Sequence, residues 1–263
     1  MAFFMNIIPS LTGNNNDTVN GTELDDTIFD FFGNNTINAN AGNDFILTKS
    51  GNDMVRGGVG NDRIHTGAGN DSIFGDAGND QIFAGADDDW IFSGNGNDVI
   101  FGQFGNDTIK LDGGNNTARG GLGNDQIFVG WSDGNNKLYG GWGQDSLTGG
   151  RGNDVLVGGP GNDVLKTSVG QDQVYGGKGA DSFVIRGRDI GTTRIMDFSF
   201  SDGDSIQFEN LEISSVGRLG NIITASTIDA SGTMGQLEVV CSRSRLWGAD
   251  ANQLMEDLIA RIN

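Results

Sequence analysis

The nine residues from 57 to 65 read Gly57-Gly58-Val59-Gly60-Asn61-Asp62-Arg63-Ile64-His65, and variants of this unit repeat through most of the 263-residue chain. From Asp26 onward an aspartate recurs every nine residues, with asparagine instead at 35, 116 and 136 and a slip of two residues before 136. We call these the beat positions. A short, fixed period indicates one small unit stacked on itself, so it decides the fold ahead of any local propensity.

An apolar side chain follows each beat position by two residues. In a three-residue strand such as Arg63-Ile64-His65, the middle side chain points to one face and its neighbours to the other. The core formed in this way is thin, and the glycine-rich turns cost ordering entropy, so a further stabiliser is needed. The side chains expected in the core are Ile28, Ile37, Ile46, Val55, Ile64, Ile73, Ile82, Ile91, Ile100, Ile109, Ala118, Ile127, Leu138, Leu147, Leu156, Leu165, Val174 and Phe183.

The pattern Gly-Gly-x-Gly-Asn-Asp-x-Ile-x resembles the repeat-in-toxin (RTX) nonapeptide of haemolysin-type calcium-binding proteins, over roughly residues 21–188. The resemblance implies an all-β fold, a right-handed parallel β-roll. Each nonapeptide would form a six-residue turn and a three-residue strand, and two nonapeptides would complete one turn of the roll.

Beat residues eighteen apart are expected to lie above one another, at about the 4.8 Å spacing of strands. Bare carboxylates at that spacing repel by about 3–4 kcal/mol per pair at an effective dielectric near 20. A divalent cation between turns would have to turn this repulsion into a net attraction. Aspartate and carbonyl oxygens suit a hard ion, and the resemblance implies several six-coordinate Ca²⁺ ions. The expected ligand residues are Asp26, Asp44, Asp53, Asp62, Asp71, Asp80, Asp89, Asp98, Asp107, Asp125, Asp145, Asp154, Asp163, Asp172 and Asp181, with the loop glycines Gly42, Gly51, Gly60, Gly69, Gly78, Gly96, Gly105, Gly123, Gly152 and Gly161.

The two columns of beat positions are unequal. One runs unbroken from Asp53 to Asp181, whereas Asn116 and Asn136 follow each other in the other column. An amide offers an oxygen but no charge, so we expect vacant or irregular calcium sites between residues 112 and 136. Asp112 and Asp133 are the substitute carboxylates there. Trp131 lies at this discontinuity. The discontinuity either displays Trp131 to a partner or results from sequence drift in a repeat array that tolerates variation.

Four segments are expected along the chain: an N-terminal cap strand (1–20), the calcium-binding roll (21–188), an antiparallel β cap (189–248) and a terminal amphipathic helix (249–263). Residues 193–208 resemble the segment that follows the roll in serralysin-type C-terminal domains. The helix is expected from about Asp250, its N-cap, to Ile262, with Leu254 and Leu258 on its apolar face. It either docks on the cap, which we favour, or forms part of an export signal.

The N-terminal residues, Met1 to Pro9, lack the basic region and long apolar run of a signal peptide, and no transmembrane segment is expected. Cys241 is the only cysteine, so the fold does not depend on an internal disulfide. The RTX resemblance implies type I secretion machinery as a partner. Glycine-loop calcium sites of low rigidity are expected to bind calcium with dissociation constants of about 10⁻⁴–10⁻³ M, as extracellular modules do. Such sites would be largely empty in the cytosol, so we expect an extracellular protein that folds when calcium binds outside the cell.

A search for catalytic residues argues against an enzyme. The His-Glu-x-x-His of zinc proteases is missing from the sequence, and His65, the only histidine, occupies an outward strand position. Gly130-Trp131-Ser132-Asp133-Gly134 matches the Gly-x-Ser-x-Gly of hydrolases, but that motif needs a strand-to-helix turn. Ser132 would also lie roughly 17 Å from His65 at the strand spacing.

Three functions stay open on these residues. The first is a structural, surface-associated or assembly role for a calcium-bound roll. The second is a calcium-dependent carbohydrate-binding or adhesion module that recognises cell-surface polysaccharide, with the non-catalytic part of a secreted hydrolase system ranked behind it. Acidic sheets disfavour anionic polymers unless calcium bridges them. Ice binding, the third, lacks its row of threonines. The formal charge of −19 argues against nucleic acid as a partner.

Positions three after the beat are expected to face solvent. Phe83 and Phe101 belong to one such row of largely apolar side chains. Exposed apolar stripes often mark a contact surface, so the row is a candidate for self-association.

Overall fold

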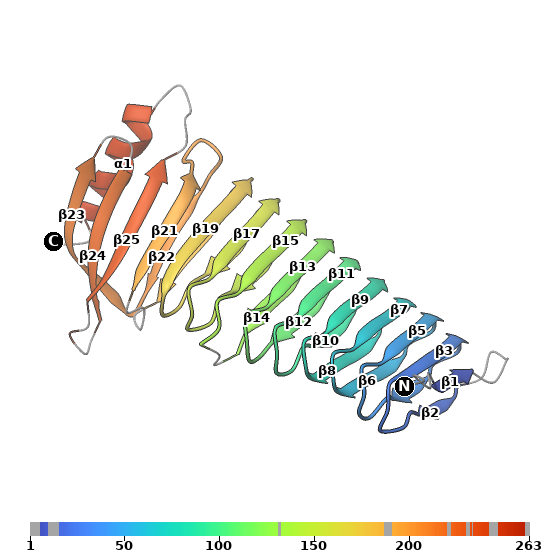
Figure 1. Ribbon diagram of the computed structural model, residues 1–263. Coiled ribbons are helices and arrows are strands. Elements are labelled where there is room, and N and C mark those ends of the chain that lie inside the picture. Colours follow the sequence, from blue (N-terminus) through green and yellow to red (C-terminus); the bar gives the residue numbers. More distant parts are fainter. Residues whose placement is uncertain are drawn as a thin grey trace. The chain divides into compact units, whose positions relative to one another are not determined.

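The computed structural model describes residues 6–9, 16–130, 133–186, 191–219, 222–229, 232, 234–241 and 247–260. The chain forms two compact units, Met1–Ser132 and Asp133–Asn263. Short strands connected by tight turns make up most of both units (Figure 1). The expected all-β parallel solenoid with a C-terminal helix is confirmed.

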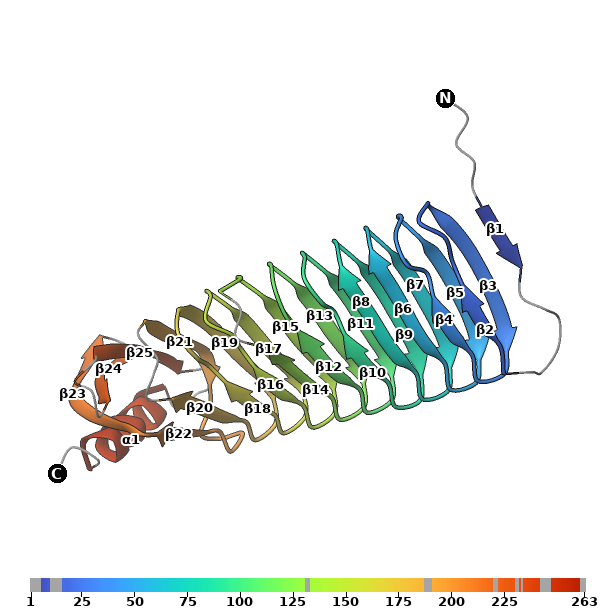
Figure 2. The same cartoon turned by 90° about the horizontal axis from the view of Figure 1, so that it is seen from below.

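Two parallel sheets build the first unit, and we call them the odd and the even sheet after their strand numbers (Figures 1 and 2). The odd sheet contains, in order, β1 (Asn6–Pro9), β3 (Asp26–Phe32), β5 (Phe45–Ser50), β7 (Arg63–Ala68), β9 (Gln81–Ala86), β11 (Val99–Phe104) and β13 (Thr117–Leu122). The even sheet contains β2 (Thr18–Asn20), β4 (Thr36–Asn38), β6 (Met54–Val59), β8 (Ser72–Ala77), β10 (Trp90–Phe92), β12 (Thr108–Leu111) and β14 (Gln126–Val129). The chain therefore alternates between the sheets, and β1 is the edge strand beside β3.

The register is set by the period of the sequence. Ile64 of β7 pairs with Ile46 on one side and Ile82 on the other, each eighteen residues away. The apolar residues that follow the beat by two are all buried, with at most 1 % of their surface exposed. Both sheets therefore contribute to one thin aliphatic core, which confirms the predicted core residues.

Many strands are longer than the three residues that the RTX resemblance implied, whereas β2, β4 and β10 have that length. β7 runs from Arg63 to Ala68, and its pairing with β9 continues past His65 to Gly67 and Ala68. β6 contains the pair Gly57-Gly58, and its pairing with β8 continues to Gly58 and Val59, so a glycine pair does not end the strand. The backbone of the pair lies directly against that of the next turn, which extends the hydrogen-bonded ladder into what the sequence indicated as turn.

The second unit begins with the same alternation. One sheet contains, in order, β15 (Lys137–Trp142), β17 (Val155–Pro160), β19 (Gln171–Lys178), β21 (Thr192–Phe198), β25 (Met234–Cys241), β24 (Ile222–Asp229) and β23 (Leu211–Leu219). The other contains β16 (Ser146–Thr148), β18 (Val164–Lys166), β20 (Ser182–Arg186) and β22 (Ser205–Glu209). β21 and β25 are parallel, whereas β25, β24 and β23 pair antiparallel, so the parallel stack ends in an antiparallel meander.

The helix α1 (Trp247–Ala260) packs on this meander, in contact with β23, β24 and β25 (Figure 1). Its Leu254 and Leu258 are buried, as expected for a docked helix. The predicted start was wrong, because the helix begins at Trp247 and Asp250 lies within its first turn instead of capping it. An acidic residue in a first turn still suits the helix dipole, which is why the sequence was ambiguous there.

Candidate metal centres

The beat aspartates lie in the turns that lead into the strands. Each is between 1 and 3 % exposed, although its charge would favour solvent. Glycine makes this burial possible, since Gly60 has φ of +141° and a Cβ there would collide with the carbonyl oxygen of Gly42 in the preceding turn. The turns therefore pack closely enough to enclose the carboxylates.

In most beat aspartates, one carboxylate oxygen is held by the neighbouring turn, whereas Asp26 accepts from the amide and hydroxyl of Thr22 in its own turn. The Asp44 amide donates to Oδ1 of Asp62 at 2.8 Å, and the Asp62 amide donates to Oδ1 of Asp80 at 2.8 Å. The other edge repeats this pattern, for example from the Asp71 amide to Oδ1 of Asp89 at 2.9 Å. In the second unit the Asp163 amide donates to Oδ1 of Asp181 at 2.9 Å. Beat residues eighteen apart thus lie in contact, as the sequence predicted.

The second oxygen has no such partner in many turns. Buried Oδ2 atoms without a hydrogen-bonding partner belong to Asp44, Asp62, Asp80, Asp89, Asp107, Asp163 and Asp181. A buried acceptor left unsatisfied costs about 1–3 kcal/mol, and more when it is charged. Such a series of acceptors is the signature of a missing donor or cation.

Glycines leave space beside these oxygens. A Cβ at Gly57 would collide with Oδ2 of Asp62 and lie 3.0 Å from the carbonyl oxygen of Gly75 in the next turn. The same space lies beside Gly102, where Oδ2 of Asp107 and the carbonyl oxygen of Gly120 converge. Carboxylate and carbonyl oxygens converging from two turns fit Ca²⁺, which takes six to eight oxygen ligands.

Burial raises the pKa of these carboxyl groups. It raises the pKa of Asp62 to about 6, of Asp80 to about 7 and of Asp89 to about 8, against the opposing effect of the backbone hydrogen bond that each accepts. Neighbouring carboxylates, such as Asp71 and Asp107 around Asp89, raise the pKa further but contribute less than burial. Repulsion between carboxylates, which was expected from the sequence, is therefore the smaller cause and burial the larger one.

The donor set is one of oxygens only. Within the described parts of the chain, no group of three His, Cys, Asp or Glu side chains comes together that could hold a metal ion. Each space offers carboxylate oxygen supplemented by backbone carbonyls, which suits a hard cation better than zinc or copper.

Two polar features were missed from the sequence. The first is an asparagine ladder outside the carboxylates, in which the Asn61 amide donates to Oδ1 of Asn43 at 2.9 Å and the Asn79 amide to Oδ1 of Asn61 at 2.8 Å. The eighteen-residue spacing of Asn43, Asn61 and Asn79 was the signal for it. Its donors point along the chain in the opposite sense to those of the aspartate column, so each turn is tied to both of its neighbours.

The second feature missed is Asp204, which is buried and extends the carboxylate column beyond the repeats. Its Oδ1 accepts the Asp181 amide at 3.0 Å and its Oδ2 accepts the Ser199 amide at 2.8 Å. Asp204 lies 23 residues after Asp181, so the period could not find it. Both of its oxygens are satisfied by amides, which distinguishes it from Asp62 or Asp80 but not from Asp154, whose Oδ1 accepts the Asn136 amide and whose Oδ2 accepts the Gly150 amide, each at 2.8 Å.

The family follows from this geometry together with a comparison of the sequence with family models. A model of the RTX calcium-binding nonapeptide repeat matches residues 11–46, 47–82, 74–109, 101–133, 111–147, 132–156 and 148–183, well over half of the chain. The chain belongs to the RTX calcium-binding nonapeptide repeat family. It is a calcium-binding β-roll protein with several ions per chain, as the sequence predicted. The matches end at residue 183, so the serralysin-like character of residues 193–208 stays a prediction.

Other comparisons add little. A solved structure described as a hyperactive, Ca²⁺-dependent, β-helical antifreeze protein from an Antarctic bacterium is 16 % identical, with a TM-score of 0.35, and the match covers 76 % of this chain and 95 % of that one. A likeness of this size carries no argument about function. No curated protein matches the chain.

Asp112 and Asp133 were expected to be the substitute carboxylates between residues 112 and 136. Asp112 forms an ion pair with Lys110 at 3.7 Å, and Asp133 forms one with Arg151 at 3.6 Å. Trp131 and Ser132 lie outside the described residues, as does the centre of the Gly-x-Ser-x-Gly match.

No helix in the described ranges has the length and apolar character needed to cross a membrane.

Proposed function

We propose that this RTX protein is a secreted, non-enzymatic structural or surface-associated protein whose roll folds when calcium binds outside the cell. The proposal assigns the beat aspartates from Asp26 to Asp181, with the loop glycines from Gly42 to Gly161, as the calcium ligands. Backbone amides of this chain orient the carboxylates by donating to them, and glycine carbonyl oxygens converge on the same spaces. The cation would supply the positive charge that these oxygens lack.

The observation that carries the proposal is the row of buried, unpartnered Oδ2 atoms, such as those of Asp62, Asp80 and Asp107. Their raised pKa values mean that the ionised form is disfavoured in the metal-free fold. A protein with so thin a core does not tolerate many such groups at neutral pH, so we expect the metal-free roll to be disordered.

A calcium titration watched by far-UV circular dichroism at pH 8 tests the proposal. Below about 10 µM Ca²⁺ the β signal should be missing, and it should develop cooperatively at millimolar Ca²⁺. Magnesium at the same concentrations is the matched control, because it demands a smaller octahedral site. An unchanged spectrum in chelator would refute the dependence on calcium.

Secretion is the second part of the proposal. RTX repeat proteins are typically extracellular, and sites with affinities of about 10⁻⁴–10⁻³ M would be largely empty in the cytosol. Expression with and without a type I exporter, with the protein measured in the medium, tests this part. Equal amounts in the medium without the exporter would contradict it.

A carbohydrate-binding role is the second candidate, and the outer face of the odd sheet favours it. The sequences of β5, β7, β9, β11 and β13 contain no Asp or Glu, whereas Lys49, Arg63 and Arg119 are exposed on them. The acidity lies in the turns, so the sequence argument that an acidic surface repels anionic polymers does not extend to this face.

This face also has a trough. Its volume is about 360 Å³, and Gly67 and Gly85 lie between a ridge containing His65 and Phe83 and the exposed Phe104. The rings of His65 and Phe83 stack with centroids 4.4 Å apart, which makes the ridge rigid. Lys49 lines the trough, and its ammonium group, which lies 4.2 Å from the centre of the Phe31 ring, is the positive charge nearby that an anionic sugar would require.

A glycan array containing uronic-acid polymers, read with and without calcium, separates the two candidate functions. If the odd face binds sugar, Lys49→Ala and Phe104→Ser should each weaken the signal, and Met54→Ser should not. Met54 is similarly exposed but lies on the even sheet. An array without calcium-dependent signals leaves the structural role as the function.

A further inference from the structure

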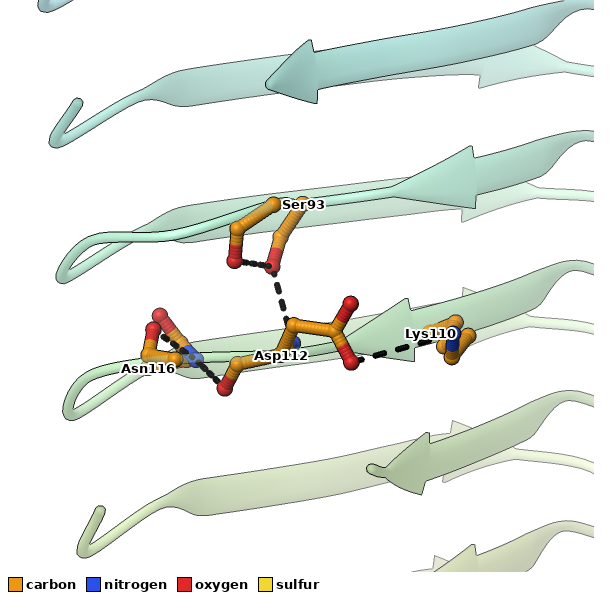
Figure 3. A network of polar contacts seen from close by, with 6 residues as sticks. Ser93, Lys110, Asp112 and Asn116 are labelled. Atoms are coloured by element: carbon orange, nitrogen blue, oxygen red, sulfur yellow. Dashed lines mark hydrogen bonds and ion pairs between the residues drawn. The ribbon is translucent and has the colours of Figure 1, made fainter. Parts of the chain in front are cut away.

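The beat position at residue 116 holds an asparagine whose amide group faces its own turn. Nδ2 of Asn116 donates to the carbonyl oxygens of Asp112 at 3.3 Å and Gly113 at 3.4 Å (Figure 3). Oδ1 of the same side chain accepts the Asp98 amide at 2.7 Å, as an aspartate does at other beat positions. Asn116 therefore preserves the contact between turns and places a donor where an aspartate has its second oxygen.

The other two beat asparagines behave in the same way. Nδ2 of Asn136 donates to the carbonyl oxygen of Gly134 at 2.8 Å and to Oδ1 of Asp154 at 3.1 Å. Nδ2 of Asn35 donates to the carbonyl oxygen of Phe32 at 3.3 Å, and Oδ1 of Asn35 accepts the Asp17 amide at 3.1 Å. All three side chains are as buried as the aspartates. Three turns with different sequences thus share one arrangement.

The chemistry of the two residue types differs at one atom. Oδ2 of an ionised aspartate can only accept, so beside carbonyl oxygens it needs a cation. Nδ2 of asparagine carries two N–H donors and satisfies carbonyl oxygens directly. The amide group thus supplies locally the positive partial charge that calcium supplies in the aspartate turns.

We infer that Asn35, Asn116 and Asn136 replace a calcium ion in their turns, so that these turns close without metal while the aspartate turns whose Oδ2 has no partner require it. The choice between Asp and Asn at a beat position then sets how many ions the roll binds. This inference rests on the proposed assignment of the beat aspartates as ligands. It also gives a physical reason for the irregular site expected at residue 116, where the sequence argument considered only the loss of charge.

The test exchanges the two residue types in opposite directions and counts ions. Asp107→Asn changes a position whose Oδ2 has no partner and whose space also receives the Gly120 carbonyl oxygen. We expect it to bind about one Ca²⁺ fewer per chain and to fold at a lower calcium concentration. Asn116→Asp should bind about one more ion and fold only at a higher calcium concentration. Native mass spectrometry and equilibrium dialysis with calcium alone supply the count, and circular dichroism supplies the folding midpoint.

Asn115→Asp is the matched control. It adds the same charge one residue away, at an exposed position of the asparagine ladder, and should leave the ion count unchanged. Leu111 is buried at the end of β12, five residues before Asn116, as Gly57 precedes Asp62. A double variant that combines Asn116→Asp with Leu111→Gly therefore restores the open space found beside Gly57. If the wild type binds calcium but the ion count is unchanged in both Asp107→Asn and the double variant, the inference is overturned and the proposed function is not. A wild type that binds no calcium would instead overturn the proposed function.

Discussion

The amide of Asp62 donates a 2.8 Å hydrogen bond to Oδ1 of Asp80 one turn away, while Oδ2 of Asp80 is buried without any hydrogen-bonding partner. One half of the carboxylate thus holds adjacent turns together, and the other half makes the metal-free fold costly. The same side chain specifies the roll and makes it depend on a cation.

The first prediction concerns pH. The pKa values of Asp62, Asp80 and Asp89 are raised to about 6, 7 and 8 in the fold, against about 3.9 in an unfolded chain. The metal-free fold therefore binds more protons than the unfolded chain. Its stabilisation by protons is fully present below about pH 4 and is lost as the pH rises through 6 to 8.

Protein freed of metal on a chelating resin should accordingly have more β signal by circular dichroism at pH 5.5 than at pH 8.5. In millimolar Ca²⁺ the β signal should no longer decrease between pH 5.5 and pH 8.5, because calcium takes the place of the protons. Metal-free protein with more β structure at pH 8.5 than at pH 5.5 would contradict the burial of ionisable carboxyl groups.

The second prediction concerns the glycine beside a carboxylate. Gly57→Ala places a methyl group against Oδ2 of Asp62 and close to the Gly75 carbonyl oxygen. The φ of Gly57 is not in the left-handed region, so only the loss of space is tested. Overpacking of this kind costs about 1–3 kcal/mol, and the calcium midpoint of folding should rise.

Gly113→Ala is the control for Gly57→Ala, since its new methyl group would come too close only to the flexible side-chain oxygen of Asn95 and would lie at an ordinary 3.7 Å from the Asn95 Cα. Calcium titrations followed by circular dichroism compare the two variants. Equal midpoints would show that the space beside Gly57 does not hold an ion.

The third prediction concerns self-association through the odd face. Phe83 and Phe101, expected to face solvent, are in fact half-buried, because their rings stack with centroids 4.9 Å apart and planes 5° apart. The pair Phe83→Ser and Phe101→Ser should abolish calcium-dependent association while the monomer stays folded. Sedimentation velocity in calcium measures this, with Met54→Ser on the even sheet as the control. Association that survives the double change places the interface elsewhere.

The fourth prediction concerns the terminal helix. Leu254 and Leu258 are 4 and 2 % exposed against the antiparallel strands. Replacing either by alanine should lower the free energy of unfolding of the second unit by about 2–5 kcal/mol. Glu256→Ala, on the exposed side of α1, should change it by less than about 0.5 kcal/mol. Thermal melting in saturating calcium makes the comparison, and equal melting temperatures for all three variants would mean that the helix is not docked.

The sequence determined the period, the inward apolar residues and the two carboxylate columns. These features are one-dimensional, because a unit that repeats every nine residues must place equivalent side chains above one another once it stacks, as Ile64 and Ile82 show. It also determined the chemistry of the cation, since glycine carbonyls and aspartates leave only oxygen donors.

Only the tertiary structure decided how each polar atom is used. It showed that Oδ1 of Asp80 is bound and Oδ2 is not, that Nδ2 of Asn116 points into its own turn, and that Asp204 continues the column despite a different spacing. It also showed a sheet face without carboxylates on a chain with a charge of −19. The physical reason is that a repeat fixes which residues are neighbours, whereas burial and hydrogen-bond direction depend on the packing of adjacent turns.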